Sequence, residues 1–273
     1  MKSYQTVEGR ESRVESKPNA APLFSRPRPS TLDPRHAFTL IELLVVISII
    51  TLIAALLLPV AGSAKRLAVI HNAQAEMAQL ETAIDRYKSA YGFYPPDSTT
   101  TFLNPSSGIS IPINQLYYEL LGTTNIALPT ATPIYQLLNN ASQQLTGDAG
   151  GQVDTAFGVI GFMNCNKPGA DESTPQARNF LPDLKPDRIG TVTITNKVTG
   201  HFATISNLIT SVGGPAAAYK PLGVFSMNPW RYNSSNPTNS PGSYDLWVQL
   251  VFGQQTNLIC NWNNRRQINS PLP

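Results

Sequence analysis

One carboxylate stands inside the most apolar part of the chain. Glu42 is the fifth residue of a segment that begins at Phe38, and no charge follows it between Leu43 and Ala64. A carboxylate in an apolar span is costly and by default marks a functional residue. If the chain is cut after Ala37, the new α-amino group of Phe38 supplies a cation. Because the two groups lie along one helix, we expect Glu42 to pair with a neighbouring copy's amine. An incidental, solvated carboxylate remains the alternative.

Other groups of chemistry-bearing residues give weaker signals. Asp183 and Asp187 are flanked by basic residues, and this pattern favours a solvated loop over a catalytic pair. Cys165 and Cys260 are not in a Cys-x-x-Cys pattern, which excludes a Cys-rich zinc module. Both a single disulfide and two separate thiols stay open. The aromatic residues of the C-terminal part favour core packing over a sugar-stacking face; they are Trp230, Tyr232, Tyr244, Trp247 and Trp262.

The apolar run is long enough to cross a bilayer. A helix over the 22 residues of 43–64 measures about 33 Å, against about 30 Å of hydrocarbon. A secretory signal peptide has a shorter apolar region. We therefore expect a transmembrane helix over about 38–64.

The charge distribution predicts the orientation of this helix. The formal net charge of +3 belongs entirely to residues 1–37, and residues 38–273 hold 13 basic and 13 acidic side chains. Basic residues tend to stay on the cytoplasmic side of a span. The pattern places residues 1–37 in the cytoplasm and the head in the periplasm, and it does not indicate a nucleic-acid partner.

The helical pattern continues beyond the apolar run. Residues 65–91 carry apolar side chains at spacings of three and four, namely Met77, Leu80, Ile84, Tyr87 and Tyr91. Gly92 and the following prolines predict where the helix ends, and Pro59 is a candidate kink.

Residues 100–220 are rich in Thr, Ser, Asn, Gly and Pro, and we expect a loop-rich insertion there. Short helices are predicted over 114–121 and 133–138. Apolar and β-branched patterns predict strands over 190–199, 201–205, 222–225 and 244–252. The Asn-rich tail from Gln254 gives no strand signal.

The segment His36-Ala37-Phe38-Thr39-Leu40-Ile41-Glu42, with the apolar span and Pro59 behind it, resembles the class III signal of type IV pilin-like proteins. The resemblance implies that a prepilin peptidase cuts between Ala37 and Phe38 and methylates the Phe38 amine. It also implies that Glu42 sets filament register against a neighbour's N-terminus and that Pro59 kinks the helix. Ala37 departs from the glycine that usually precedes the cut.

Two further segments are similar to the major pseudopilins of type II secretion. One is the end of the long helix with Gly92-Phe-Tyr94-Pro95, and the other is Asn228-Pro-Trp230-Arg-Tyr232 with Tyr244-Asp-Leu-Trp247. Asn228 and Arg231 replace the Asp and Gly usual in that pattern. Those proteins often carry a calcium loop, but 253–267 contains no Asp or Glu, so calcium is disfavoured and no cofactor is expected.

Together these observations predict an α+β protein. It would have a cleaved cytoplasmic leader (1–37), an N-terminal helix (38–92) packed on a small antiparallel sheet, and a periplasmic head (93–273). The resemblance implies a pseudopilin of a type II secretion system in the bacterial inner membrane, a structural subunit and not an enzyme. Its partners would be the prepilin peptidase, other pseudopilin subunits in homo- and hetero-oligomeric filaments, the inner-membrane assembly platform and membrane lipid.

Three alternatives remain open: a minor type IV pilin or adhesin, a membrane-anchored periplasmic binding protein, and an anchored hydrolase. A binding protein should line one exposed face with aromatic residues. A hydrolase should show a perturbed carboxylate or a nucleophile cluster in a cleft.

Overall fold

The computed structural model describes residues 38–98, 101–103, 110–169, 176–195, 200–211, 227–253 and 255–270, with backbone only at 57–61, 101–103, 110–112 and 266. The predicted strand over 222–225 and the last residues of the one over 190–199 lie outside these ranges. The described chain divides into two units, with the boundary between Ala54 and Ala55 inside the first helix. Each unit is described by itself.

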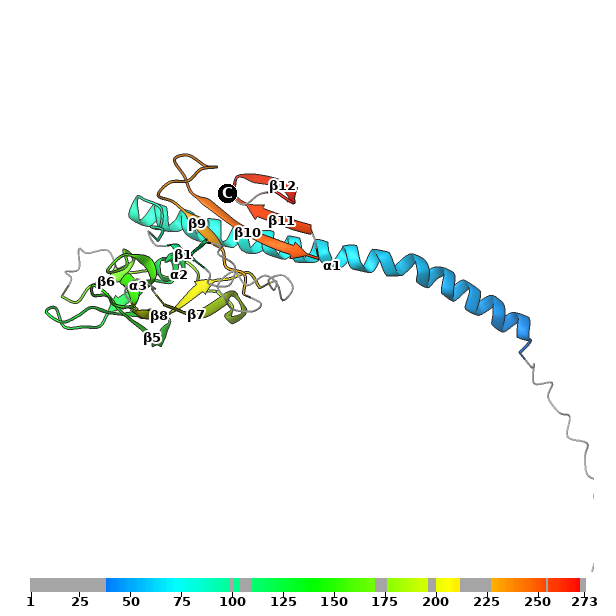
Figure 1. The fold of residues 1–273 in the computed structure, drawn as a ribbon, viewed down its shortest axis with the longest axis horizontal. Helices are drawn as coiled ribbons and strands as arrows, with labels where there is room; N and C mark the ends of the chain where they lie inside the picture. The colour runs from blue at the N-terminus through cyan, green and yellow to red at the C-terminus, as the bar shows by residue number, and fades with distance from the viewer. Residues whose placement is uncertain are drawn as a thin grey trace, which may run out of the picture. The chain divides into compact units, whose positions relative to one another are not determined.

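The described chain is α+β, as predicted (Figure 1). Its helices are α1 (Leu40–Tyr91), α2 (Leu116–Leu121), α3 (Gln152–Phe157) and a 3-10 turn, η1 (Pro186–Arg188). Its strands are β1 (Thr101–Leu103), β2 (Ser110–Pro112), β3 (Thr123–Asn125), β4 (Ile134–Leu137), β5 (Asn140–Thr146), β6 (Cys165–Asn166), β7 (Ile189–Thr195), β8 (Phe202–Leu208), β9 (Arg231–Asn233), β10 (Asp245–Phe252), β11 (Gln255–Cys260) and β12 (Asn263–Ile268).

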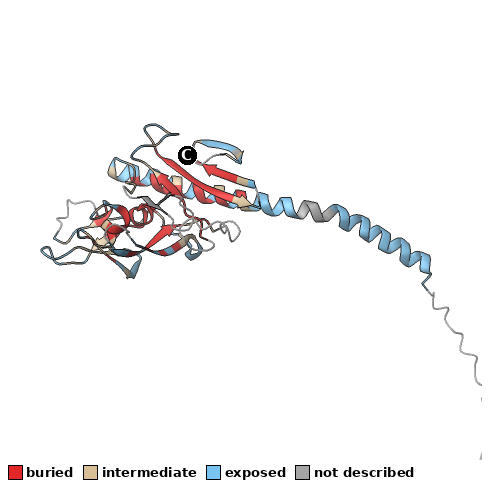
Figure 2. Cartoon of the chain, in the orientation of Figure 1, coloured by how far each residue is buried: buried red, intermediate tan, exposed pale blue. Residues whose placement is uncertain are grey.

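The first unit contains the start of α1. Every side chain over 38–54 is exposed, although most of them are apolar (Figure 2). Among the helices of the described residues, none carries an apolar stretch of the length needed to span a bilayer.

The second unit contains the rest of α1, which buries one side. The buried stripe recurs at helical spacing and consists of Ile70, Ala73, Met77, Leu80, Ala83, Ile84 and Tyr87. The predicted amphipathic pattern is confirmed, with Tyr91 only half-buried. The helix ends at Tyr91 because Gly92 adopts a left-handed conformation (φ 85°) and donates its N–H to the Lys88 carbonyl.

The C-terminal sheet has the strand order β12-β11-β10-β9 and is antiparallel throughout. Strand β10 is buried along six consecutive residues, and its Leu246, Val248 and Leu250 share one core with the buried stripe of α1. The sequence predicts β10 but misses β11 and β12, because their Asn-rich segments lack the apolar alternation of a typical strand. Instead, β11 and β12 are positioned by pairing on β10 and on each other.

A second four-stranded sheet, β5-β4-β3-β6, lies within the expected insertion, and its β3–β6 pair is parallel. The helix predicted over 133–138 is wrong. Ile134–Leu137 forms β4, which pairs with β3 on one side and β5 on the other. Ile134 and Tyr135 favour strands, and pairing on both edges overrides the weak helical pattern.

The β7–β8 hairpin confirms another prediction. Val192 and Ile194 are buried on one face of β7, and the register pairs Val192 with Ile205. Strand β8 also contacts α2 and α3, so the hairpin closes over these helices. The described part of 100–220 therefore contains more helix and strand than the loop-rich segment that the sequence predicts.

Candidate functional site

The start of α1 holds Glu42 in a reciprocal pair with Thr39. The Thr39 backbone N–H and hydroxyl donate to Glu42 Oε2 at 2.8 and 2.7 Å. The Glu42 N–H donates back to Thr39 Oγ1 at 3.3 Å. This Thr-x-x-Glu arrangement is a capping box, which satisfies backbone donors that a helix start leaves unpaired. Sequence reasoning missed this partner, although the spacing of Thr39 and Glu42 signals it.

The apolar side chains behind Glu42 form an uncovered surface in the first unit. Phe38 is 74% exposed and Leu40 80% exposed, and the exposure continues on all sides of the helix. Soluble monomers rarely leave a contiguous apolar surface of this kind in water. This surface is suited to contact with lipid or with other apolar helices.

The remaining predicted residues of the signal are less fully described. Ala37 lies outside the described residues, so cleavage between Ala37 and Phe38 stays a prediction. At Pro59 the backbone is helical, but its side chain is outside the described set, and the predicted kink is not tested.

The comparison with family models decides what kind of signal this is. A model described as the prokaryotic N-terminal methylation motif matches residues 33–58. This chain carries the class III signal typical of type IV pilins and pseudopilins. No curated protein and no solved structure matches the chain significantly.

Of the two alternatives left open for Cys165 and Cys260, the structure does not form the single disulfide. Both cysteines are buried free thiols. Cys165 belongs to β6 and Cys260 to β11, which are strands of two different sheets. In the structure they are two separate thiols, and burial raises the pKa of both.

The two segments that resemble major pseudopilins meet at the end of α1. The Tyr94 and Tyr244 rings pack edge to face at 5.1 Å, and Ser243 donates its hydroxyl to the Tyr94 hydroxyl at 3.2 Å. The Tyr232 hydroxyl donates to the Pro95 carbonyl at 2.8 Å. These contacts form a joint between helix and sheet.

The aromatic residues confirm the core interpretation. Four of them are buried and Trp262 is half-buried; the buried ones are Trp230, Tyr232, Tyr244 and Trp247. Within the described ranges they do not form the exposed stacking face expected of a sugar-binding module.

A polar cluster around Glu119 connects α1 to the 100–220 region. Glu119 of α2 is fully buried and accepts hydrogen bonds from the Tyr87 hydroxyl (2.9 Å), the Met163 N–H (2.8 Å) and the Asn164 N–H (2.9 Å). The Asn164 amide in turn accepts from the Tyr91 hydroxyl at 2.7 Å. Burial outweighs these donors and raises the pKa of Glu119.

Glu119 does not have the setting of a catalytic carboxylate. It is enclosed by its hydrogen-bond donors, and it ties α1 to α2 and to the chain around Asn164. Its role in the structure is to hold these elements together.

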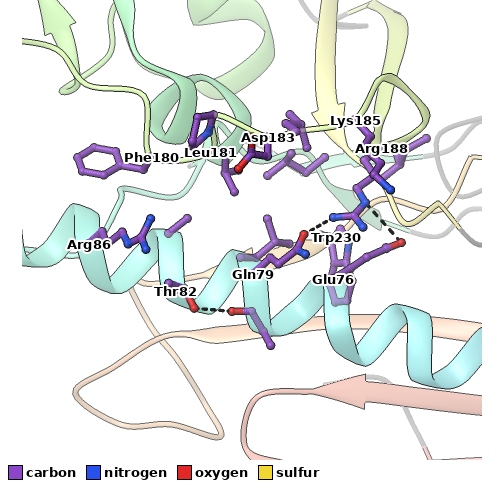
Figure 3. Close-up of a pocket in the computed structure, with 17 residues that line it drawn as sticks. Glu76, Gln79, Thr82, Arg86, Phe180, Leu181, Asp183, Lys185, Arg188 and Trp230 are labelled. Atoms are coloured by element: carbon purple, nitrogen blue, oxygen red, sulfur yellow. Dashed lines mark hydrogen bonds and ion pairs between the residues drawn. The ribbon is translucent and has the colours of Figure 1, made fainter.

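Another buried carboxylate, Glu76, lies at the edge of a cavity beside α1 (Figure 3). The Arg188 Nε lies 3.6 Å from Glu76 Oε1, and Arg188 also donates to Gln79 Oε1. Ser211 donates its N–H to Glu76 at 3.2 Å and its hydroxyl to the same carboxylate. Sequence reasoning missed Glu76. Its position next to Met77, on the buried stripe of α1, is the signal that could have identified it.

Proposed function

We propose that this chain is a pseudopilin of a type II secretion system, with a structural and not an enzymatic role. A prepilin peptidase would cut it between Ala37 and Phe38 and methylate the Phe38 amine. The mature chain would then assemble with other subunits into a short periplasmic filament. The observation that supports this most strongly is the methylation motif over residues 33–58. Its apolar part forms the exposed start of α1.

The apolar surface of 40–56 supports a route through the inner membrane. In the proposal, lipid covers these side chains first, with residues 1–37 on the cytoplasmic side and the head in the periplasm. In the filament, helices of neighbouring subunits replace the lipid. Apolar side chains remain out of water in both states.

The capping box leaves Glu42 able to take a second partner. Its hydrogen bonds from Thr39 both end on Oε2, and Oε1 makes none within the described part of the chain. In the proposal, Oε1 receives the Phe38 amine of a neighbouring subunit. Desolvation offsets much of the attraction of a buried ion pair, so the pair would set axial register more than it adds stability.

The helix–sheet joint favours a type II pseudopilin over a pilus subunit. It is built from Tyr94, Pro95, Tyr232 and Tyr244, the segments that resemble major pseudopilins. A minor type IV pilin is the second candidate, and the ordered β5-β4-β3-β6 sheet favours it because an additional folded sheet can serve binding.

Incorporation into filaments tests the proposal. The tagged full chain is expressed with a prepilin peptidase and a type II assembly platform, and its fraction in sheared filaments is measured. Glu42→Ala should leave membrane insertion intact and lower incorporation at least tenfold. The matched variant Asp85→Ala, which removes an exposed carboxylate of the same helix, should incorporate normally. Normal incorporation of Glu42→Ala would contradict the register role.

A further inference from the structure

The cavity beside α1 has the size of a small-molecule site. It encloses about 510 Å³ and lies between α1 and the segment from Phe180 to Arg188, within the second unit (Figure 3). Pockets that hold small organic ligands commonly measure about 300–1,000 Å³.

The walls of this cavity are mixed, and their apolar part comes from three directions. Leu80 and Ala83 contribute from α1, Phe180 and Leu184 from the facing segment, and Trp230 from the chain before β9. A small inorganic ion would leave these walls uncovered, so the site is suited to a ligand with an apolar body.

Basic side chains lie at both ends of the cavity. Arg86 lies at one end, and Lys185 and Arg188 lie at the other (Figure 3). Arg188 reaches Gln79, and the seven helical rises from Gln79 to Arg86 measure about 10 Å along the helix. A molecule of one or two rings spans that length.

The charges in the cavity favour an anion. The carboxylate of Glu76 is already engaged by Ser211 and Arg188. In the described part of the chain, neither the Arg86 nor the Lys185 side chain makes a hydrogen bond or an ion pair, and Asp183 is the one other carboxylate in the lining. Because Arg188 is already paired with Glu76, the two remaining cations, Arg86 and Lys185, face one uncommitted carboxylate.

We propose that this cavity binds a small organic carboxylate with an apolar, ring-containing body. The ring packs between Leu80 of α1 and Phe180, and the carboxylate pairs at one end of the cavity with an uncommitted basic side chain, Arg86 or Lys185. This inference does not depend on filament assembly, because every group it uses belongs to the second unit.

Fluorine NMR of the uncut full chain in lipid nanodiscs tests the site. The probe is a trifluoromethyl-naphthalene carboxylate, compared with the matching naphthalene methanol, and empty nanodiscs give the background. We expect the carboxylate to bind at least tenfold more tightly than the alcohol. The double variant Arg86→Gln/Lys185→Gln should remove this preference, because it removes two exposed charges at the rim.

A matched variant controls for charge alone. Lys167→Gln removes an exposed lysine that does not line the cavity, and binding should remain unchanged. Equal binding of acid and alcohol, an unchanged preference in the double variant, or no binding above empty nanodiscs would each overturn the inference. Because the chain is uncut in this assay, such a failure leaves the proposed pseudopilin function untouched.

Discussion

The Tyr87 hydroxyl donates a 2.9 Å hydrogen bond to the carboxylate of Glu119, and both residues are fully buried. Tyr87 belongs to α1 and Glu119 to α2, so this bond attaches the insertion region to the long helix. An unsatisfied buried polar group costs about 1–3 kcal/mol. The bond therefore predicts a stability effect that can be measured.

Tyr87→Phe should lower the free energy of unfolding by about 1–3 kcal/mol, because it leaves the Glu119 carboxylate one donor short. The measurement is unfolding followed by tryptophan fluorescence of the full chain in nanodiscs. Tyr135→Phe is the comparison, since it removes an exposed hydrogen bond from the hydroxyl of a half-buried tyrosine of β4 to the Ile160 carbonyl. An equal or smaller loss for Tyr87→Phe would contradict a stabilising role for the Tyr87–Glu119 hydrogen bond.

The raised pKa of Glu119 predicts a pH dependence. Its pKa in the folded chain lies above its ordinary value of 4.5, so the folded state holds a proton that unfolding releases. Stability should therefore fall as pH rises from 4.5 through the folded pKa. Glu119→Gln cannot titrate and should flatten this slope. If wild type and variant show parallel profiles, Glu119 does not carry the effect.

The burial pattern of α1 predicts which of its leucines contributes more to the free energy of unfolding. Leu80 is 5% exposed and Leu67 is 45% exposed. Leu80→Ala should cost about 2–4 kcal/mol, from lost apolar burial and from the space left behind. Leu67→Ala should change the free energy of unfolding by less than about 0.5 kcal/mol. Similar losses at both positions would show that α1 does not pack as described.

The two cysteines predict a simple labelling pattern. Both are buried free thiols, at 7% and 1% exposure for Cys165 and Cys260. A bulky maleimide should label neither quickly in the folded chain and both in denaturant without reductant. Labelling that appears only after reduction would reveal a disulfide.

The sequence predicts those features of the fold that depend on local periodicity and on backbone steric rules. The stripe from Met77 to Tyr87, the end of α1 at Gly92 and the alternation of Val192 and Ile194 all lie where their patterns indicate. The signal around Glu42 is equally local, and the family model identifies it.

The features that the sequence does not predict depend on residues that lie far away along the chain. Ile134–Leu137 is a strand because β3 and β5 pair with it, and the Asn-rich β11 and β12 form on β10. Glu76 acquires its role from Arg188 and Ser211, more than a hundred residues further along the chain. A local pattern contains no information about such pairings.

The pilin-like account is tested most directly by mass spectrometry of the N-terminus of the chain, made in cells that contain a prepilin peptidase. The account predicts a mature chain that begins at Phe38 with one methyl group on its α-amine. A chain that keeps its leader, or that is cut elsewhere, would contradict it.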